Sequence, residues 1–272
     1  MQQLMLWRNR IRKFCDHPQA IVPFLKKQLY YRWVSDRYIP LYRNVHFFAY
    51  DETIEEILTK NRSIVRFGDD VFDMLLGIGL YFNNWHQRYN SALATRLKEV
   101  LSSSDDRLLV SFNPELIFKT RTEMKSLGIG LQHQFWTTSR VYMKDYIHFD
   151  RSYGSALSFH ERYNTHLPYE RIIEHLRCKH LIIVASNTAR FDGKQFGLTT
   201  DYIEGPTSDA WNRYDWLLGE VRSVAAGYRK EETLIMTSLG PTSKVMVYDL
   251  TKEGYIAWDT GQFFDLALKR LV

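Results

Sequence analysis

Short apolar segments alternate with helical segments along most of this chain, and this alternation limits the possible folds more than any other feature of the sequence. The segments that we predict to be strands are 63–67, 107–112, 180–185, 201–204, 232–238 and 255–258. Helical segments are predicted around them, over 51–58, 91–101, 169–176, 209–226 and 241–250. Apolar strands and helices that alternate at this spacing form a mostly parallel sheet with helices on both faces. The sequence therefore predicts an α/β fold.

The first 50 residues differ from the rest of the chain in charge. Nine Lys and Arg residues but only two acids, Asp16 and Asp36, lie within residues 1–43, and aromatic and apolar residues are interspersed among them. This pattern predicts a basic, aromatic helical arm over 1–50. The arm suits an anionic membrane surface, and it equally suits packing on the domain or on a second subunit through residues 1–45. Nucleic acid is not expected as a partner, because the remainder of the chain has no basic stripe and no recognised binding motif.

The rest of the chain indicates one cytoplasmic domain. Residues 51–272 contain no internal repeat and no low-complexity linker, so we expect a single domain there. The two cysteines, Cys15 and Cys178, have no CxxC spacing, which argues against a disulfide framework and favours a reducing compartment. We find no signal peptide and no apolar stretch of the roughly 20 residues that a membrane-spanning helix needs. We therefore expect a cytoplasmic protein, either soluble or peripheral at the inner face of the membrane.

The carboxyl ends of parallel strands are where ligands bind, and the strand 63–67 is followed by a cluster of acids. The residues concerned are Gly68, Asp69, Asp70 and Asp73. Carboxylate oxygens suit a divalent cation; the alternative is that Asp69 or Asp70 simply caps the helix that follows. Arg66 lies inside the strand, where an unpaired cation is costly. We therefore expect Arg66 to pair with one of these acids or with a bound phosphate.

A second strand end carries a turn that suits a phosphate group. The strand 232–238 leads into Gly240-Pro241-Thr242 at the start of a helix, and the backbone N–H groups at a helix start attract phosphate. Arg190 and Lys244 would supply the cations that a diphosphate requires. The alternative is an ordinary helix cap at Thr242, with both cations solvated. No Walker A, dinucleotide-binding, HExxH or GxSxG motif is present.

Several blocks of the sequence, taken together, resemble the GT-D-fold glycosyltransferase family. The blocks keep the family's order and spacing over residues 51–264, and the first and the last are the most specific. They are Ser63 to Asp69, Tyr153-Gly154 followed by Arg162, Ala185 to Arg190, Pro206 with Ala210 and Tyr214, Leu239 to Tyr255, and Asp259-Thr260-Gly261. The N-terminal arm lies outside the resemblance.

The resemblance implies a Rossmann-like bacterial transferase that takes a hexose, typically glucose, from a UDP-sugar and extends a glycan on a surface glycoprotein or polysaccharide. It also implies a divalent metal, Mn2+ or Mg2+, at an Asp-x-Glu motif. That motif reads Asp69-Asp70-Val71 here, and the family's usual His after the Asp-x-Gly step is Gln262. Two hypotheses follow. Either Asp70 or Asp73 replaces the missing carboxylate, or the chain keeps the pocket without metal catalysis, as a sugar-nucleotide-binding module or as a partner of another transferase.

Under the first hypothesis the resemblance implies a role for individual residues. Asp69 and Arg66 set the geometry of the reaction, and Asp259 is the candidate general base by its position at a strand end, with Glu161 and His160 as alternatives. The metal ligands would be Asp69, Asp70 and Asp73. The residues that would hold the nucleotide-sugar are Gly68, Arg162, Arg190, Gly240, Pro241, Thr242 and Lys244. A metal-dependent phosphoesterase is a third interpretation, although such sites normally use a fuller set of Asp, Asn and His ligands.

Overall fold

The computed structural model describes residues 11–82, 84–126, 139–160, 163–188, 191–261 and 263, with only the backbone for Asp69, Asp70, Glu115 and Lys125. The chain forms two compact units. The first comprises Met1–Phe47, Phe67–Ser102 and Phe112–Tyr153, and the second comprises Phe48–Arg66, Ser103–Ser111 and Gly154–Val272. The division into an arm over 1–50 and a domain over 51–272 remains a prediction from the sequence.

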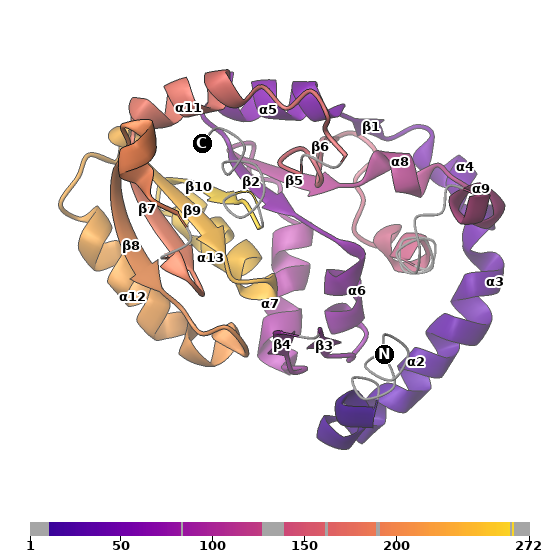
Figure 1. Ribbon diagram of the computed structural model, residues 1–272. Helices are drawn as coiled ribbons and strands as arrows, with labels where there is room; N and C mark the ends of the chain where they lie inside the picture. The colour runs from indigo at the N-terminus through magenta and orange to yellow at the C-terminus, as the bar shows by residue number, and fades with distance from the viewer. Residues whose placement is uncertain are drawn as a thin grey trace. The chain divides into compact units, whose positions relative to one another are not determined.

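A parallel sheet is the main element of the fold. Its strand order is β1-β6-β5-β2-β10-β9-β7-β8 (Figure 1), and every described pairing within it is parallel. The strands are β1 (His46–Phe47), β2 (Ser63–Arg66), β5 (Leu108–Phe112), β6 (Ser152–Ser155), β7 (His180–Ala185), β8 (Thr199–Glu204), β9 (Thr233–Ser238) and β10 (Ile256–Asp259). The α/β fold predicted from the sequence is confirmed.

Helices cover both faces of the sheet within the second unit. On one face, α5 (Tyr50–Thr59) and α11 (Tyr169–Arg177) pack into a core with alternate residues of β7 and β9. On the other face, α13 (Pro241–Lys252) packs on β2, β9 and β10, while α12 (Tyr214–Ala225) packs on β7 and β8. Because successive side chains of a strand point to opposite faces, a strand covered on both sides must be apolar throughout. The continuous run Leu181–Val184, which is entirely buried, meets this requirement.

The described part of the second unit also contains three short 3-10 helices. They are η5 (Gly193–Phe196), η6 (Ala210–Arg213) and η7 (Lys230–Glu232). The predicted helix over 209–226 is thus divided between η6 and α12. Asp209, before η6, has a left-handed backbone with φ of 52°, which interrupts a regular helix at its first turn.

The first unit is mostly helical. Its N-terminal part is a nearly continuous helical rod (Figure 1) made of η1 (Pro18–Ala20), α2 (Ile21–Lys26), η2 (Lys27–Tyr31), α3 (Arg32–Val34), η3 (Ser35–Tyr38) and α4 (Ile39–Tyr42). The further elements are α6 (Asp69–Leu75), α7 (Ser91–Leu101), α8 (Pro114–Ile117), α9 (Arg121–Ser126) and the antiparallel pair β3 (Leu80–Tyr81) and β4 (His86–Gln87). None of the described helices is both long and apolar enough to span a bilayer.

Several short elements of the structure were not predicted from the sequence. Strands β1, β3 and β4 have two residues each, which is too short for an apolar alternation to be visible. Strand β6 contains Gly154, where a Cβ atom would lie 2.4 Å from the Ser111 hydroxyl oxygen. A glycine is required at this close approach, and because glycine is depleted in strands, no strand was predicted there.

Candidate active site

Three neighbouring strands of the second unit end at the same edge of the sheet. Strand β10 lies between β2 and β9, with Trp258 opposite Ile64 and Asp259 opposite Thr237. The last residues of the three strands, Arg66, Asp259 and Ser238, are therefore neighbours at the carboxyl edge. This is the edge at which parallel α/β sheets bind ligands.

Arg66 at the end of β2 is held by the end of β10. Its backbone N–H donates to Asp259 Oδ2 at 3.2 Å, and its Nε donates to the Asp259 carbonyl oxygen at 2.6 Å. Its Nη2 lies 3.7 Å from Asp259 Oδ1, and Nη1 donates to the Ala156 carbonyl oxygen at 3.2 Å. A buried cation needs a partner of this kind. The partner that the sequence led us to expect was an acid of the 69–73 cluster or a phosphate, but the partner in the described structure comes from another strand.

Lys244 brings a second cation to Asp259. Its Nζ donates to Asp259 Oδ2 at 2.9 Å and to the Gly240 carbonyl oxygen at 3.3 Å. The side chains of Lys244 and Asp259 are 8% and 3% exposed, so the alternative of a solvated lysine does not hold. Two cations and one carboxylate give this cluster a formal charge of +1. An excess positive charge at a sheet edge is suited to an anionic ligand.

The turn between β9 and α13 places an unpartnered hydroxyl beside this cluster. Gly240 adopts φ 60° and ψ −134°, a conformation that only glycine enters readily. Ser243 accepts the Leu239 backbone N–H at 2.6 Å. Thr242, in the first turn of the helix, is fully buried, and its Oγ1 has no hydrogen-bond partner among the described residues. A buried hydroxyl without a partner costs about 1–3 kcal/mol.

Gly261, which follows β10, makes room for the Arg66 guanidinium. Its φ is +53°, and a Cβ atom there would lie 2.0 Å from Arg66 Nη2. The Ser238 hydroxyl donates to the Gly261 carbonyl oxygen at 2.7 Å, which fixes the loop against the end of β9. In the sequence, Gly261 belongs to an Asp-Thr-Gly step that follows a predicted strand and forms one of the family blocks. That step indicates a strand end, but no sequence pattern indicates the contact of Gly261 with Arg66.

The acid cluster 69–73 belongs to the first unit. Helix α6 begins at Asp69 after Gly68, with no side-chain cap at Gly68. Asp69 and Asp70 therefore lie inside the helix, whereas the cap hypothesis placed one of them just before it. Asp73 is 6% exposed, and its Oδ1 accepts a hydrogen bond from the buried Lys27 ammonium group. The side chains of Asp69 and Asp70 lie outside the described part of the structure.

The described residues do not fit a metal centre at this motif. Val71 is buried and offers no ligand atom, and a cation already occupies the Asp73 carboxylate. Nowhere in the described part of the chain do three or more His, Cys, Asp or Glu side chains gather as metal ligands. Metal binding through Asp69 and Asp70 remains a prediction, and no chemical step below depends on it.

The remaining residues predicted for the site are separate from this cluster or undescribed. Arg162, Arg190, Glu161 and Gln262 lie outside the described residues. His160 is described, and its ring contacts the Tyr163 ring edge-on at 5.0 Å between centroids. The structure thus brings together Arg66, Asp259, Gly240, Pro241, Thr242 and Lys244, while their roles remain predictions.

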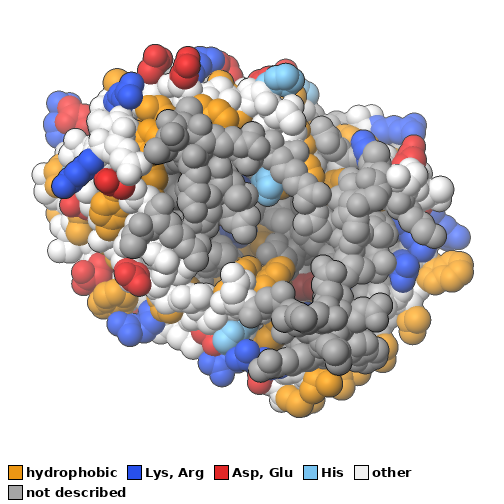
Figure 2. All heavy atoms as spheres, in the orientation of Figure 1, with side chains coloured by type: hydrophobic (Ala, Val, Ile, Leu, Met, Phe, Trp, Pro, Cys, Tyr) orange, Lys and Arg blue, Asp and Glu red, His pale blue; other side chains and the backbone are white. Residues whose placement is uncertain are grey.

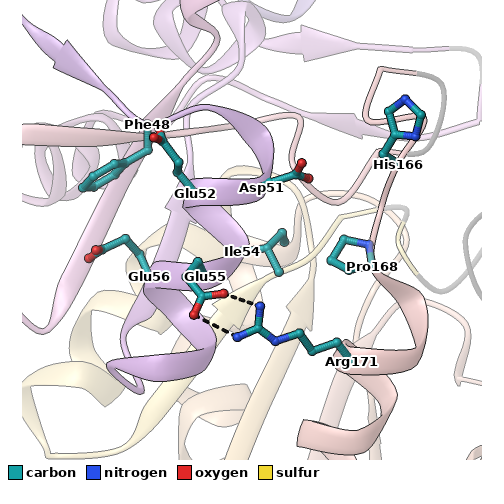
Figure 3. Close-up of a pocket in the computed structure, with 9 residues that line it drawn as sticks. All are labelled: Phe48, Asp51, Glu52, Ile54, Glu55, Glu56, His166, Pro168 and Arg171. Carbon is teal, nitrogen blue, oxygen red and sulfur yellow. Dashed lines mark hydrogen bonds and ion pairs between the residues drawn. The ribbon is translucent and has the colours of Figure 1, made fainter.

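A separate cavity of about 570 Å³ lies in the second unit between α5 and α11 (Figure 3). Three of the four acids that line it have partners: Glu52 accepts the Ala49 backbone N–H at 2.8 Å, and Glu55 accepts from Arg171 at 2.8 Å. Glu56 accepts from Lys60 and Arg62. None of the predicted site residues lines this cavity, and capping and pairing within the helix layer explain these three carboxylates.

The comparison with known families assigns the chain to a family. The family model described as "Glycosyltransferase GT-D fold" matches residues 64–265, from β2 to beyond β10. The chain belongs to the GT-D-fold glycosyltransferase family. The matched segment contains the whole Arg66, Lys244 and Asp259 cluster and leaves out the helical rod of the first unit.

Curated relatives carry the same assignment. The chain is 29% identical over 239 residues to the probable glycosyl transferase Gly of Streptococcus gordonii. The aligned region covers 82% of this chain and 32% of the relative. It is 27% identical over 232 residues to the glycosyltransferase GlyD of Streptococcus pneumoniae serotype 4. Here the aligned region covers 78% of this chain and 26% of the relative. The chain therefore spans between about a quarter and a third of the length of the curated relatives it matches.

Solved structures of GT-D-fold domains resemble this one. A structure of the domain of unknown function 1792, described as having a distinct glycosyltransferase fold, is 26% identical, with a TM-score of 0.66 over 85% of this chain and 82% of that one. A glycosyltransferase of the same domain type from Streptococcus sanguinis is 24% identical, with a TM-score of 0.61 over 80% and 82% of the two chains. The second likeness concerns the fold alone.

Proposed function

We propose that this GT-D glycosyltransferase transfers a hexose, typically glucose, from a UDP-sugar to a glycan acceptor on a bacterial surface glycoprotein or polysaccharide. The observation that carries the proposal is the buried cluster of Arg66, Lys244 and Asp259 at the carboxyl edge of the sheet, with its excess positive charge. A UDP-sugar presents a diphosphate, which such a cluster suits.

The chemistry requires stabilisation of the leaving group. The acceptor hydroxyl attacks the anomeric carbon, the bond from that carbon to the diphosphate oxygen breaks, and UDP leaves with an additional negative charge. Fixed cations and backbone N–H groups that face the developing charge lower the barrier. Lys244 and the first turn of α13, with the unpartnered Thr242 hydroxyl, would supply such groups without reorganisation.

The contacts of Asp259 favour a positioning role over that of general base. Its Oδ2 accepts from Lys244 Nζ and from the Arg66 backbone N–H. These two hydrogen bonds use both lone pairs of that oxygen, and Oδ1 lies 3.7 Å from Arg66 Nη2. We therefore propose that Asp259 orients the two cations, and that the base comes from elsewhere.

The second candidate function is a sugar-nucleotide-binding module or a partner of another transferase. It is favoured by Val71, which occupies the position of the family's metal-binding Glu, and by Asp73, which is paired with Lys27. Both functions predict UDP binding, and only the first predicts release of sugar from the donor. The free, exposed cysteines Cys15 and Cys178 suit a reducing, cytoplasmic location under either function.

Replacement of Thr242 by Val tests the nucleotide site. Valine keeps the volume and removes the unpartnered buried hydroxyl, so we expect stability to be unchanged or increased and UDP affinity to fall by several fold. Calorimetry with UDP and UDP-glucose, each with Mn2+ and with EDTA, together with a donor-hydrolysis assay, measures the effect. Unchanged affinity in Thr242→Val would remove this hydroxyl from the site.

A matched pair of lysine variants on α13 tests the cation. Lys244→Met should lower UDP affinity by about tenfold or more, because hydrogen bonds to charged groups contribute about 1.5–3 kcal/mol. Lys252→Met, on the exposed end of the same helix, should have no effect. No UDP binding with or without metal would overturn both functions. Binding without donor hydrolysis would favour the binding module.

A further inference from the structure

The helical rod of the first unit exposes a row of large apolar side chains. Val22, Leu29 and Trp33 are 72%, 65% and 77% exposed. With Ile21 and Leu25, they form what we call the exposed stripe, in which Leu25, Leu29 and Trp33 follow Ile21 at intervals of four residues. Residues at this spacing lie on one face of a helix. Figure 2 shows hydrophobic side chains spaced along the line that α2 and α3 follow in Figure 1, with Lys and Arg side chains beside them.

The opposite face of the rod is already packed within the first unit. Ala20, Lys27 and Ser35 are buried, and the Lys27 ammonium group bonds Asp73 of α6. The half-buried Tyr31 contacts Tyr142 edge-on, with 4.6 Å between ring centroids. The rod is therefore anchored by one face, and the exposed stripe is the face that the first unit does not use.

Cations accompany the stripe, while the one acid of the rod, Asp36, is paired within the first unit. Lys26 and Arg37, which follow Val22 and Trp33 by four residues, are exposed and have no ion-pair partner among the described residues. Asp36 pairs with Arg140 Nη2 at 3.0 Å and also accepts the Arg121 backbone N–H. The surface around the stripe consequently carries positive charge that nothing in the described first unit offsets.

We propose that the exposed stripe docks this enzyme on an anionic lipid surface, with the rod lying in the plane of the interface. An amphipathic helix with apolar residues and Trp on one face and cations at its border binds in this way. Apolar side chains enter the headgroup region, and Lys26 and Arg37 contact the anionic headgroups. The docking is independent of the transfer reaction and would persist if the proposed donor were wrong.

The charges favour lipid over a second copy of the chain. A symmetric dimer places the same surface patch of both subunits against itself. The border cations Lys26 and Arg37 would then meet a surface of the same charge, which disfavours association. An anionic lipid surface complements both the apolar stripe and its cationic border.

Sedimentation of the full chain with vesicles tests the proposal. We expect binding to phosphatidylcholine vesicles that contain phosphatidylglycerol, weak binding to phosphatidylcholine alone, and a decrease as salt is raised. Leu29→Gln with Trp33→Gln should lower the partition coefficient at least about tenfold, and Lys26→Glu with Arg37→Glu should do so at low salt. These side chains are exposed, so the variants should fold.

Matched variants of the same unit serve as controls. Phe149→Gln removes an exposed aromatic residue that is not part of the rod, and Lys98→Glu reverses an exposed charge on α7; both should bind as the native chain does. Equal binding of native and stripe variants would overturn the proposal. Analytical ultracentrifugation tests the alternative occupant. If the native chain does not bind anionic vesicles but forms dimers, and if Leu29→Gln with Trp33→Gln dissociates these dimers, the stripe would be assigned to a second copy instead.

Discussion

At the scale of single residues, the site depends on a glycine that carries no chemistry. Gly261 adopts a positive φ, and a side chain there would occupy the space of the Arg66 guanidinium. We expect Gly261→Ala to lower the free energy of unfolding by more than about 1 kcal/mol, since strain and steric displacement add. The same change should weaken UDP binding, because Arg66 could no longer hold Asp259 as it does.

A second glycine provides the control for this prediction. Gly219 lies inside α12, and a Cβ atom there would meet nothing within 4 Å. Gly219→Ala should therefore stabilise the protein by about 0.5–1 kcal/mol through helix propensity. Urea denaturation of both variants, with UDP calorimetry, gives the comparison. Equal effects of the two substitutions would contradict a special role for Gly261.

His175 makes stability depend on pH. Its ring stacks on Trp258 with 5.7 Å between centroids, and its Nε2 is buried with no partner among the described residues. Burial, with a smaller contribution from Lys179, lowers the pKa of His175 below its ordinary value. The unfolded chain then binds this proton more readily than the folded one. The contribution of His175 to stability is therefore complete above a pH of about 6.5 and is lost as pH falls through the folded pKa.

We expect the native chain to lose more unfolding free energy than His175→Phe as pH is lowered from neutral, so that the variant becomes relatively more stable. Denaturation across this pH range measures the difference, and Gly219→Ala, which changes no titratable group, serves as the control variant. A difference for His175→Phe that does not change with pH would refute the proposed cause.

At the scale of elements, the rod is attached to α6 by a buried ion pair between Lys27 and Asp73. Removal of one member leaves an uncompensated buried charge, so Lys27→Met should cost about 3–5 kcal/mol, and Lys27→Met with Asp73→Leu should recover much of that loss. Arg96→Met breaks a partly exposed pair with Glu99 on α7 and should cost less than about 1 kcal/mol. Urea denaturation that finds similar costs for both pairs would contradict this account.

Elements of eight or more residues and buried strands were the parts that the sequence predicted best. Helix α7 and strand β7 have the predicted bounds, 91–101 and 180–185, because helical periodicity and a continuous apolar run are both local signals. Strands of two residues carry no such signal. The predicted helix over 209–226 was wrong at its start, where a left-handed residue precedes a 3-10 turn.

At the scale of the whole molecule, the sequence located the carboxyl edge of the sheet but not the contacts made there. Arg66 and Asp259 are separated by almost the whole domain in sequence, and their pairing depends on β10 lying between β2 and β9. Strand order follows from tertiary packing, which no local pattern records. Thr242 was predicted as a cap or a phosphate contact; helix α13 has no side-chain cap hydrogen bond, and the phosphate contact remains a prediction.

The π-helical turn at Lys27–Tyr31 has a consequence for how the rod tolerates changes in length. A π turn holds more residues per turn than an α turn, because its hydrogen bonds close five residues apart. It therefore sets the rotation of Trp33 relative to Val22, and deletion of one residue in this segment would turn the second half of the rod about its own axis. In this chain deletion of Gln28 or Tyr30 would divide the stripe into two halves that face different ways, while every side chain of the stripe is retained.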